Sequence, residues 1–258
     1  FTQDDAHIFC TTDQIEEEIL NLLTFSIKLL NSFGFDSIEA DLSTRPEKSI
    51  GNSDDWEKAT NSLKSALENQ NISYVTAHGE GAFYGPKIDL HVKDAIGRRW
   101  QLSTIQVDFA QPDNFDLQFV DNNNKRVKPV MIHRALLGSI ERFTGILIEN
   151  YAGEFPGWLS PVQVKILTIG DVSNYLNKIT KSLKGFRYEV DDRNLRLGEK
   201  LHDASKDRVP ISLIVGEKDE LSNTLAINIR SQENQQNVKY EDAIKQIKAN
   251  LKTPIFKI

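Results

Sequence analysis

The sequence predicts two dissimilar domains: an α+β domain with an antiparallel sheet over residues 1–157, and a small α/β domain over residues 158–258. In the first part, strand patterns are joined through hairpins with long amphipathic helices between them, as in an antiparallel sheet with helices outside it. In the second part, strands alternate with helices, which indicates a small, partly parallel sheet. Between them, "GEFPGWLSP" (153–161) holds two prolines and two glycines, a composition typical of a linker.

Size and composition are those of a soluble globular protein. The chain has 258 residues, of which 39% are hydrophobic and 26% are charged. No apolar run approaches the roughly 20 residues of a membrane helix and no basic-then-apolar leader is visible, so we expect no membrane partner. The single cysteine, Cys10, excludes an internal disulfide framework and favours a cytoplasmic protein. Because the chain begins at Phe1, we expect further sequence upstream.

Charge is unevenly divided along the chain. The net charge of −6 by itself argues against a nucleic-acid binder. However, residues 156–258 hold 17 basic and 13 acidic side chains, whereas residues 1–155 hold 14 and 24. Such asymmetry favours two domains with different partners.

The longest helix expected in the first domain spans residues 11–34. Thr11 and Gln14 have capping-box spacing, apolar residues recur at helical spacing, and Gly34 is placed to end the helix. A polar run at 121–128 is expected to form a turn or surface loop. The other predicted elements are a helix over 53–70, strands over 1–10, 37–43 and 72–77, a hairpin over 87–110 that turns at Gly97, and an apolar helix over 131–153.

The second domain alternates between the two periodicities, with apolar strand runs separated by amphipathic helices. The predicted elements are strands over 162–169, 186–190, 209–216 and 224–230, and helices over 173–185, 197–207 and 240–252.

The opening stretch "FTQDDAHIFC" places ionisable groups inside a strand pattern. Alternation puts Phe1, Gln3, Asp5 and His7 on one face. Such a face suits solvent, the commoner case for a polar strand face, or the floor of a polar pocket.

The five histidines lack the tight helical spacing of a metalloprotease site. A zinc site assembled from distant segments stays open as an interpretation. His7 from the first strand and His133 from the start of the predicted helix over 131–153 form a plausible pair, whose ring nitrogens would then converge. From spacing alone, each histidine is more commonly a structural or surface residue.

Two stretches of the first domain carry candidate pocket residues. "GEGAFYGPK" (79–87) surrounds Phe83 and Tyr84 with glycines, which suits either a ligand pocket or a hairpin loop with buried aromatics. Gln101 and Gln106 lie in an apolar strand, where amides need buried partners or a ligand.

A charged side chain also stands out in the predicted helix over 131–153. Ser139 and Arg142 are three residues apart, on one side of that helix. An arginine among apolar residues needs an anion, which is either a carboxylate such as Glu141 or a phosphate.

Six segments stand out when they are taken in order: "FTQDDAHIFC", "LSTRPEKSIG", "EGAFYGPKIDLHV", "WQLSTIQVDF", "VMIHRALLGSIERFTGILIE" and "FPGWLSPVQVKIL". Together they closely resemble the threonyl-tRNA synthetase family. The resemblance covers essentially the whole chain; it is strong to about Pro161 and looser, but recognisable, at "DDRNLRLGEKL" and "RVPISLIVGEKDE". It implies the later part of a class II catalytic domain followed by an anticodon-binding domain.

The resemblance also implies roles for individual residues. The implied zinc ligands are His7 and His133. The implied threonine-site residues are Gln3, Asp5, Tyr84 and Gln106; the implied ATP-site residues are Phe1, Lys87, Gln101, Thr104, Ser139 and Arg142; and the implied anticodon contacts are Asn194 and Asp219.

The implied chemistry is ATP-dependent activation of L-threonine, with Mg²⁺, and its transfer to tRNA(Thr), by a protein that is a homodimer when complete. An apolar pocket separates threonine from valine only by roughly 10²-fold. A zinc ion with an open position takes the amino group and the hydroxyl together, and valine lacks the hydroxyl. Activation would depend mainly on positioning and on charge stabilisation by Arg142.

The sequence also departs from the family pattern. The third zinc ligand is a cysteine upstream of this chain, and Cys10 falls on a different motif position. The same upstream part would carry the first two class II motifs and any editing domain. In the second domain, Asn228 stands where the family commonly has arginine, and Asp219 where it commonly has glutamate.

Two other functions compete with a threonine–tRNA ligase fragment: a non-catalytic tRNA-binding relative, and a sister synthetase of the same class, for example for proline. The combination of Asp5, His7, His133 and Arg142 favours the ligase, because a binding module needs none of them. The two histidines argue against the proline enzyme.

Overall fold

In the computed structural model of the protein, which describes residues 1–254, the first unit is Phe1–Asn150. It is built on a six-stranded sheet whose β2–β3 pair is parallel and whose other pairs are antiparallel. The prediction of an α+β domain with an antiparallel sheet is confirmed. In spatial order the strands are β1 (Ala6–Cys10), β8 (Val130–Ala135), β5 (Arg99–Asp108), β4 (Lys87–Lys93), β2 (Ile38–Ser43) and β3 (Tyr74–Ala77).

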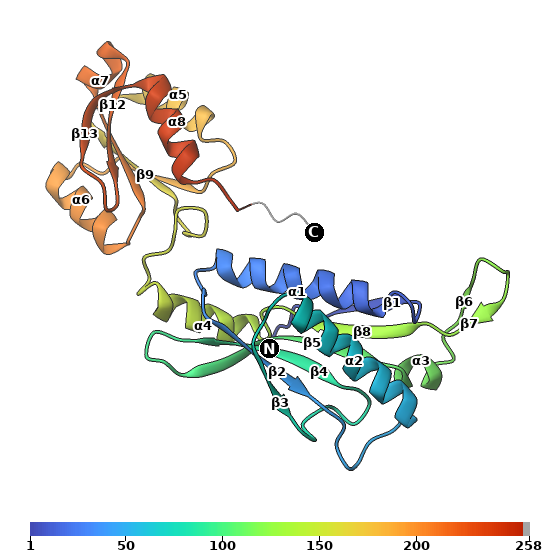
Figure 1. Ribbon diagram of the computed structural model, residues 1–258. Helices are drawn as coiled ribbons and strands as arrows, with labels where there is room; N and C mark the ends of the chain where they lie inside the picture. The colour runs from blue at the N-terminus through green and yellow to red at the C-terminus, as the bar shows by residue number, and fades with distance from the viewer. Residues whose placement is uncertain (255–258) are drawn as a thin grey trace. The chain divides into compact units, whose positions relative to one another are not determined.

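Two long helices, α1 (Ile15–Ser32) and α2 (Ser53–Asn69), pack against each other on one face of this sheet (Figure 1). The helix predicted over 11–34 is confirmed, and it ends where Gly34 takes a φ of 84° and the Phe35 amide bonds back to the Leu30 carbonyl. The predicted helix over 53–70 and the hairpin turn at Gly97 are also confirmed. Two shorter helices are α3 (Ala110–Asn114) and α4 (Ile140–Asn150).

The two faces of the sheet differ in polarity. In β4, the fully buried Ile88 and Leu90 alternate with Lys87 and Asp89. Because successive side chains of a strand point to opposite faces, the helices cover the apolar set and the polar set lies on the other face. That polar face holds the candidate site.

The helix predicted over 131–153 is wrong in its first part. Val130–Ala135 forms β8, which pairs with both β1 and β5, and the helix α4 begins only at Ile140. Gly138 turns the chain between them at a φ of 66°, where an added Cβ would lie 3.1 Å from the Leu102 carbonyl oxygen. The apolar run therefore fills the gap between two strands, and tertiary pairing overrides its helical periodicity.

Of two other parts of the unit, the first differs from the expected pattern and the second agrees with it. The strand predicted over 1–10 begins only at Ala6, and Gln3 forms an isolated bridge with Ser139. The polar run at 121–128 forms the turn of a small hairpin, β6 (Phe119–Val120) and β7 (Arg126–Val127).

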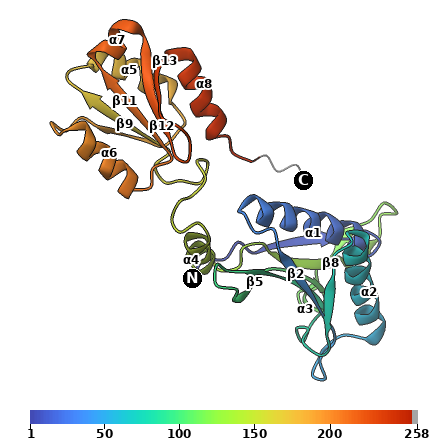
Figure 2. The same cartoon turned by 60° about the vertical axis from the view of Figure 1, so that its left-hand side comes forward.

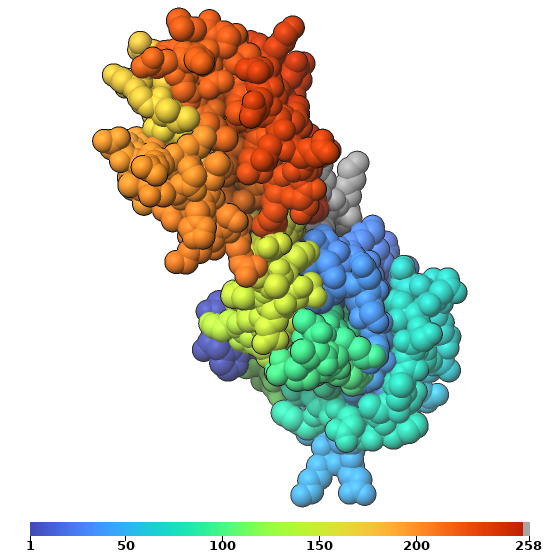
Figure 3. Space-filling view, turned by 90° about the vertical axis from the view of Figure 1, so that its left-hand side faces the viewer, coloured from blue at the N-terminus to red at the C-terminus, as the bar shows by residue number. Residues whose placement is uncertain are grey.

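The segment between β2 and α2 projects from the unit as the light-blue prong in Figure 3. Arg45 holds its base: the guanidinium donates to the Ser49 hydroxyl and the Gly51 carbonyl, and lies over the Trp56 ring at 5.4 Å. Ile50 adds two further bonds, because its amide donates to the Phe83 carbonyl and its carbonyl accepts the Trp56 indole N–H.

The second unit, from Tyr151 onward, contains a five-stranded sheet. Three neighbouring strands are parallel and the last two are antiparallel, which confirms the predicted small, partly parallel α/β domain. In spatial order the strands are β10 (Tyr188–Asp191), β9 (Val164–Ile169), β11 (Ile211–Gly216), β12 (Thr224–Ile229) and β13 (Gln235–Lys239).

The helices of this unit lie on both faces of its sheet (Figure 2). α5 (Ser173–Ser182) and α8 (Tyr240–Asn250) cover one face, and their buried residues join those of the strands in one apolar core. α6 (Leu197–Lys206) lies on the other face. β13 and the short helix α7 (Glu217–Ser222) are not among the elements predicted from the sequence.

The two units divide between Asn150 and Tyr151. The segment expected to act as a linker is bonded into the second unit: Arg230 donates to the Glu154 and Phe155 carbonyls, and Arg187 donates to the Ser160 carbonyl. The proline- and glycine-rich composition therefore marks a turn that is fixed by two arginines. The boundary between residues 157 and 158 stays a prediction.

Candidate functional site

A cavity of about 230 Å³ lies on the open, polar face of the first sheet, where β1, β8 and β5 meet. It brings together side chains from the N-terminal segment, the glycine-rich loop and two central strands. Seven of the predicted site residues line it: Gln3, Asp5, His7, Tyr84, Thr104, Gln106 and His133. Gln3, Asp5 and His7 line this cavity and are also exposed to solvent, so both interpretations of the opening stretch hold in part.

A larger groove of about 420 Å³ lies at the other end of β1, around Phe9, Leu117 and Phe119. Its lining is mainly apolar, and Cys10 is its one titratable side chain. Burial raises the pKa of this thiol to about 11, so it stays protonated at neutral pH. Cys10 is also three residues from His7 and points to the other face of the strand, so it is not placed to bind the same metal ion as His7.

The two histidines of the cavity are neighbours across the sheet. The β1–β8 register pairs His7 directly with His133, and their ring centroids lie 4.7 Å apart. The Nε2 atom of His133 lies 2.8 Å from a carboxylate oxygen of Asp108. Asp108 is fully buried, and its other oxygen accepts the amides of Ala110 and Gln111 at the start of α3.

This arrangement fixes one ring in the way that metal sites commonly do. A carboxylate that accepts one imidazole N–H holds the ring orientation and leaves the other nitrogen free as a ligand. In residues 1–254, no group of three or more His, Cys, Asp or Glu side chains is placed to hold a metal ion. The described chain thus supplies two candidate ligands and a buried carboxylate behind one of them.

Tyr84 and Gln106 form one wall of the cavity. The Tyr84 hydroxyl donates to the Gln106 amide oxygen at 2.9 Å, and its ring lies 5.5 Å from that of His133. Burial raises the pKa of Tyr84, and the carboxylates of Asp108 and Asp5 add to this effect. Its hydroxyl therefore stays protonated and serves as a hydrogen-bond donor.

Asp89 links three of the predicted ATP-site residues, and the sequence analysis missed it. Its buried carboxylate accepts hydrogen bonds from Lys87 at 2.5 Å, Gln101 at 2.6 Å and Thr104 at 2.7 Å. Asp89 could have been found from "KIDLHV", where Lys87 and Asp89 alternate with apolar residues and therefore share the polar face of the strand. Lys87 and Gln101 do not line the cavity themselves but are connected to it through Thr104.

The N-terminal segment is held against the loop that precedes α4. The Asp4 carboxylate, also missed from sequence, accepts the amides of Leu136 and Leu137. The Thr2 amide donates to the Glu141 carboxylate, whereas Phe1 is 92% exposed.

Arg142 is exposed at the start of α4. Its guanidinium donates to the Gln101 carbonyl at 2.6 Å and lies 5.8 Å from the centre of the Trp100 ring. Glu141 bonds instead to the Thr2 amide and the Ser139 hydroxyl, and the described residues contain no ion pair of Arg142. The acid-partner interpretation of Arg142 is therefore wrong for Glu141.

In the second unit, topology brings the two predicted anticodon residues to one edge of the sheet. Asn194 follows β10 and Asp219 follows β11, and both strands run parallel to β9 between them. Asn194 is exposed, while the Asp219 carboxylate accepts the Gly216 amide at the start of α7. The two side chains lie at the carboxyl edge of a parallel sheet, where such folds commonly bind ligands.

Each of the two units matches a known protein family. Residues 1–151 match the class II tRNA synthetase core domain (G, H, P, S and T), and residues 163–250 match the anticodon-binding domain. The chain belongs to the class II aminoacyl-tRNA synthetases.

Related sequences narrow the relationship within this class. The threonine–tRNA ligase of Clostridium tetani is 51% identical over 235 residues, which is 90% of this chain and 37% of that protein. The threonine–tRNA ligase of a Sulfurihydrogenibium species is 47% identical over 251 residues, which is 96% of this chain and 39% of that protein. The chain thus spans about two fifths of the length of these relatives.

Solved structures show the same fold. The RNA-binding domain of threonyl-tRNA synthetase from Cryptosporidium parvum superposes with a TM-score of 0.88 at 34% identity, covering 96% of this chain and 63% of that one. A histidyl-tRNA synthetase from S. aureus superposes with a TM-score of 0.55 at 14% identity, covering 94% and 68%, which shows the shared class II fold alone. In residues 1–254 of this synthetase chain, no helix has the length and apolarity to cross a membrane.

Proposed function

We propose that the chain is the C-terminal part of a threonine–tRNA ligase, which activates L-threonine with ATP and transfers it to tRNA(Thr). The observation that carries this proposal is the grouping of seven implied substrate and metal residues around one cavity. The names of the related ligases support threonine as the amino acid. A binding module would not need a cavity that gathers an amide, a carboxylate and two imidazoles.

We propose that His7 and His133 hold a zinc ion together with a ligand from the upstream part of the protein. Their fit rests on direct pairing across two strands and on the Asp108 carboxylate behind His133. When bound, zinc supplies a position that takes the amino group and the hydroxyl of threonine, which valine cannot fill. Asp5, on the same strand face, would accept a hydrogen bond from either group.

We propose that ATP, with Mg²⁺, binds beside this cavity. Phe1 would stack on adenine, and Lys87, Gln101 and Thr104 would form a polar wall that Asp89 holds together. Ser139 and Arg142 lie where the N-terminal segment meets α4, and the planar guanidinium fork suits phosphate oxygens. Catalysis would then consist mainly of positioning and charge stabilisation.

We propose that residues 158–258 bind the anticodon of tRNA(Thr), with Asn194 and Asp219 among the contacts. The match to the anticodon-binding domain and the shared sheet edge support this role. By the same resemblance, the complete enzyme would be a cytoplasmic homodimer.

The amino-acid site is tested by Asp5→Asn in the full-length protein. This variant keeps the shape of the side chain but removes the charge next to the substrate amine. We expect the KM for threonine in ATP–pyrophosphate exchange to rise about 10-fold or more, because the substrate amine loses a charge-assisted hydrogen bond. Asp36→Asn, which changes an exposed carboxylate next to β2, should exchange like the wild type.

The outcomes separate the competing functions. Wild-type exchange that depends on threonine, and that Asp5→Asn weakens, supports the ligase. Better exchange with proline than with threonine would identify a sister synthetase. Binding of tRNA with no exchange for any amino acid would identify a non-catalytic relative.

A further inference from the structure

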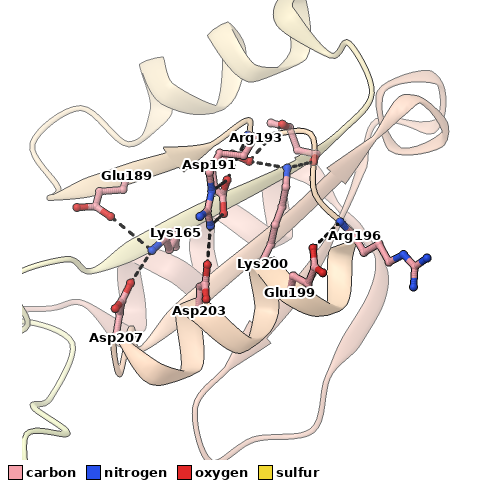
Figure 4. A network of polar contacts seen from close by, with 10 residues as sticks. Lys165, Glu189, Asp191, Arg193, Arg196, Glu199, Lys200, Asp203 and Asp207 are labelled. Carbon is pink, nitrogen blue, oxygen red and sulfur yellow. Dashed lines mark hydrogen bonds and ion pairs between the residues drawn. The ribbon is translucent and has the colours of Figure 1, made fainter.

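The segment 192–196 joins the end of β10 to the start of α6 and forms an exposed strap at the edge of the second sheet. The side chains of Asp192, Asn194, Leu195 and Arg196 are all exposed. Exposed segments of this kind are commonly mobile. In this unit, however, polar contacts hold both ends of the strap (Figure 4).

Lys200 anchors α6 to the sheet beneath the strap. Its side chain is 2% exposed, and its Nζ donates to the carbonyls of Thr168 at 2.8 Å and Asp191 at 3.0 Å. These carbonyls lie at the carboxyl ends of the neighbouring strands β9 and β10. Because a buried ammonium needs its hydrogen bonds, this contact fixes the distance between the helix and the strand ends.

Arg193 links the residue before the strap to the helix after it. Its guanidinium donates to both carboxylate oxygens of Asp191, at 2.9 and 2.7 Å, and to Asp203 on α6 at 2.7 Å (Figure 4). Asp191 is 4% exposed, and the bonds from Arg193 lower its pKa to about 2, so it is charged at neutral pH. One planar fork thus ties the last residue of β10 to the middle of α6.

Arg196, the second arginine of the strap, is held by its backbone and not by its side chain. The backbone amide of Arg196 donates to the Glu199 carboxylate at 3.3 Å, which fixes the strap's far end at the start of α6. Its guanidinium points away from the other side chains drawn in Figure 4, and the described residues contain no hydrogen bond or ion pair of this guanidinium. The strap therefore carries the exposed Asn194 amide and the exposed Arg196 guanidinium two positions apart.

We infer that Arg193 is a positioning residue for RNA binding: by bridging Asp191 and Asp203, it holds the strap in the conformation that presents Asn194 and Arg196 to the RNA. The Arg196 guanidinium suits a backbone phosphate, and the Asn194 amide suits a base edge. A strap that is already ordered loses less conformational entropy on binding, and this raises affinity. The inference rests on the proposed RNA-binding role of the second unit.

Two aspartates of this unit offer a matched pair of variants. Asp203 and Asp207 each accept one bond of 2.7 Å from a basic side chain, and their side chains are 40% and 56% exposed. Asp203 bonds Arg193 of the strap, whereas Asp207 bonds Lys165 of the central strand β9. Asp203→Asn and Asp207→Asn therefore make the same chemical change, and only the first weakens the strap.

The experiment measures the Kd for tRNA(Thr) of the full-length protein, per molecule active in threonine-dependent ATP–pyrophosphate exchange. We expect Asp203→Asn to weaken tRNA binding about 3- to 10-fold and Arg193→Lys, which loses the fork, by about 10-fold or more. Asp207→Asn should keep the wild-type Kd. Equal weakening by Asp203→Asn and Asp207→Asn would overturn the inference, because general loss of stability would then be the cause.

A double-mutant cycle separates positioning from direct contact. In the Asn194→Ala/Arg196→Ala background, Arg193→Lys should have little further effect on the Kd, because the side chains that it positions are gone. The same loss in both backgrounds, or no loss in either, would overturn the inference. If the wild-type protein binds no tRNA, it is the proposed function that fails; if it binds tRNA and Arg193→Lys binds as well, only the inference fails.

Discussion

At the residue scale, the carboxylates Asp4, Asp89 and Asp108 decide how the candidate site is arranged; Asp89 and Asp108 are buried, and Asp4 is partly buried. Each accepts several hydrogen bonds from residues that face the cavity or border it. A charged carboxylate is costly to bury unless such bonds satisfy it, so each one also imposes a position on its partners. These residues set the geometry of side chains that would touch the substrates.

Asp108 gives the sharpest prediction at this scale. In Asp108→Asn, the amide oxygen can still accept the amides of Ala110 and Gln111, so the start of α3 is kept. The amide NH₂ would face Nε2 of His133, which must then accept a proton instead of donating one. The ring proton moves to Nδ1, the nitrogen that would face the metal.

We therefore expect zinc affinity of the full-length Asp108→Asn protein to fall about 10- to 100-fold, measured by competition with a chelating dye. Its thermal unfolding midpoint should stay near that of the wild type. The matched control is Asp113→Asn, which should bind zinc like the wild type. Asp113 lies in the same helix α3, but its carboxylate forms an ion pair with Lys128. Unchanged zinc affinity in Asp108→Asn would show that Asp108 does not orient a ligand.

At the element scale, the glycine-rich loop before β4 is held close to the neighbouring strand. A Cβ at Gly85 would lie 1.8 Å from the Val107 carbonyl oxygen, far inside contact distance. The loop needs this approach because Tyr84, next in sequence, must reach Gln106 on β5. The ligand-pocket interpretation of the loop agrees with Tyr84, which lines the cavity, whereas the interpretation of buried aromatics is wrong for Phe83, which is 55% exposed.

We expect Gly85→Ala to lower the free energy of unfolding of the first unit by about 1–3 kcal/mol, because the loop or the strand must move. The shift of Tyr84 should also raise the KM for threonine. Urea denaturation checks the first effect and ATP–pyrophosphate exchange the second.

Gly145 in α4 provides the control. An added Cβ there has no neighbour within 4 Å, so Gly145→Ala should stabilise the helix by about 0.5–1 kcal/mol. If Gly85→Ala and Gly145→Ala were equally stable, the close approach at Gly85 would not be a real constraint.

At the scale of the whole molecule, each unit has a core of its own. Leu63 is fully buried on the inner face of α2 in the first unit, and Leu213 is fully buried on β11 in the second. Units with separate cores can unfold separately, so we expect two transitions for this chain.

Two core variants test this expectation. Leu213→Ala should destabilise the second unit by about 2–5 kcal/mol and leave the first transition unchanged, and Leu63→Ala should do the reverse. Calorimetry on both variants checks it. A single transition that both variants shift equally would show that the units unfold together.

The sequence by itself determined the features that depend on local periodicity and on single residues. The helix over 11–34 follows from its apolar stripe and Gly34, the hairpin over 87–110 from Gly97, and the second domain from its alternating pattern. The shared placement of Gln3, Asp5 and His7 at the cavity agrees with the alternation expected of a strand, although the strand itself begins only at Ala6. All of these are settled within a few residues of chain.

Only the tertiary structure decided which distant segments meet. The register between β1 and β8 joins residues more than 100 positions apart, and no local pattern carries that pairing. Because of this pairing, the apolar run after Val130 forms a strand and His133 lies opposite His7, with Asp108 bonded to His133. The physical reason is that burial between two strands outweighs the helical preference of five residues, so the site's geometry is fixed by sheet pairing.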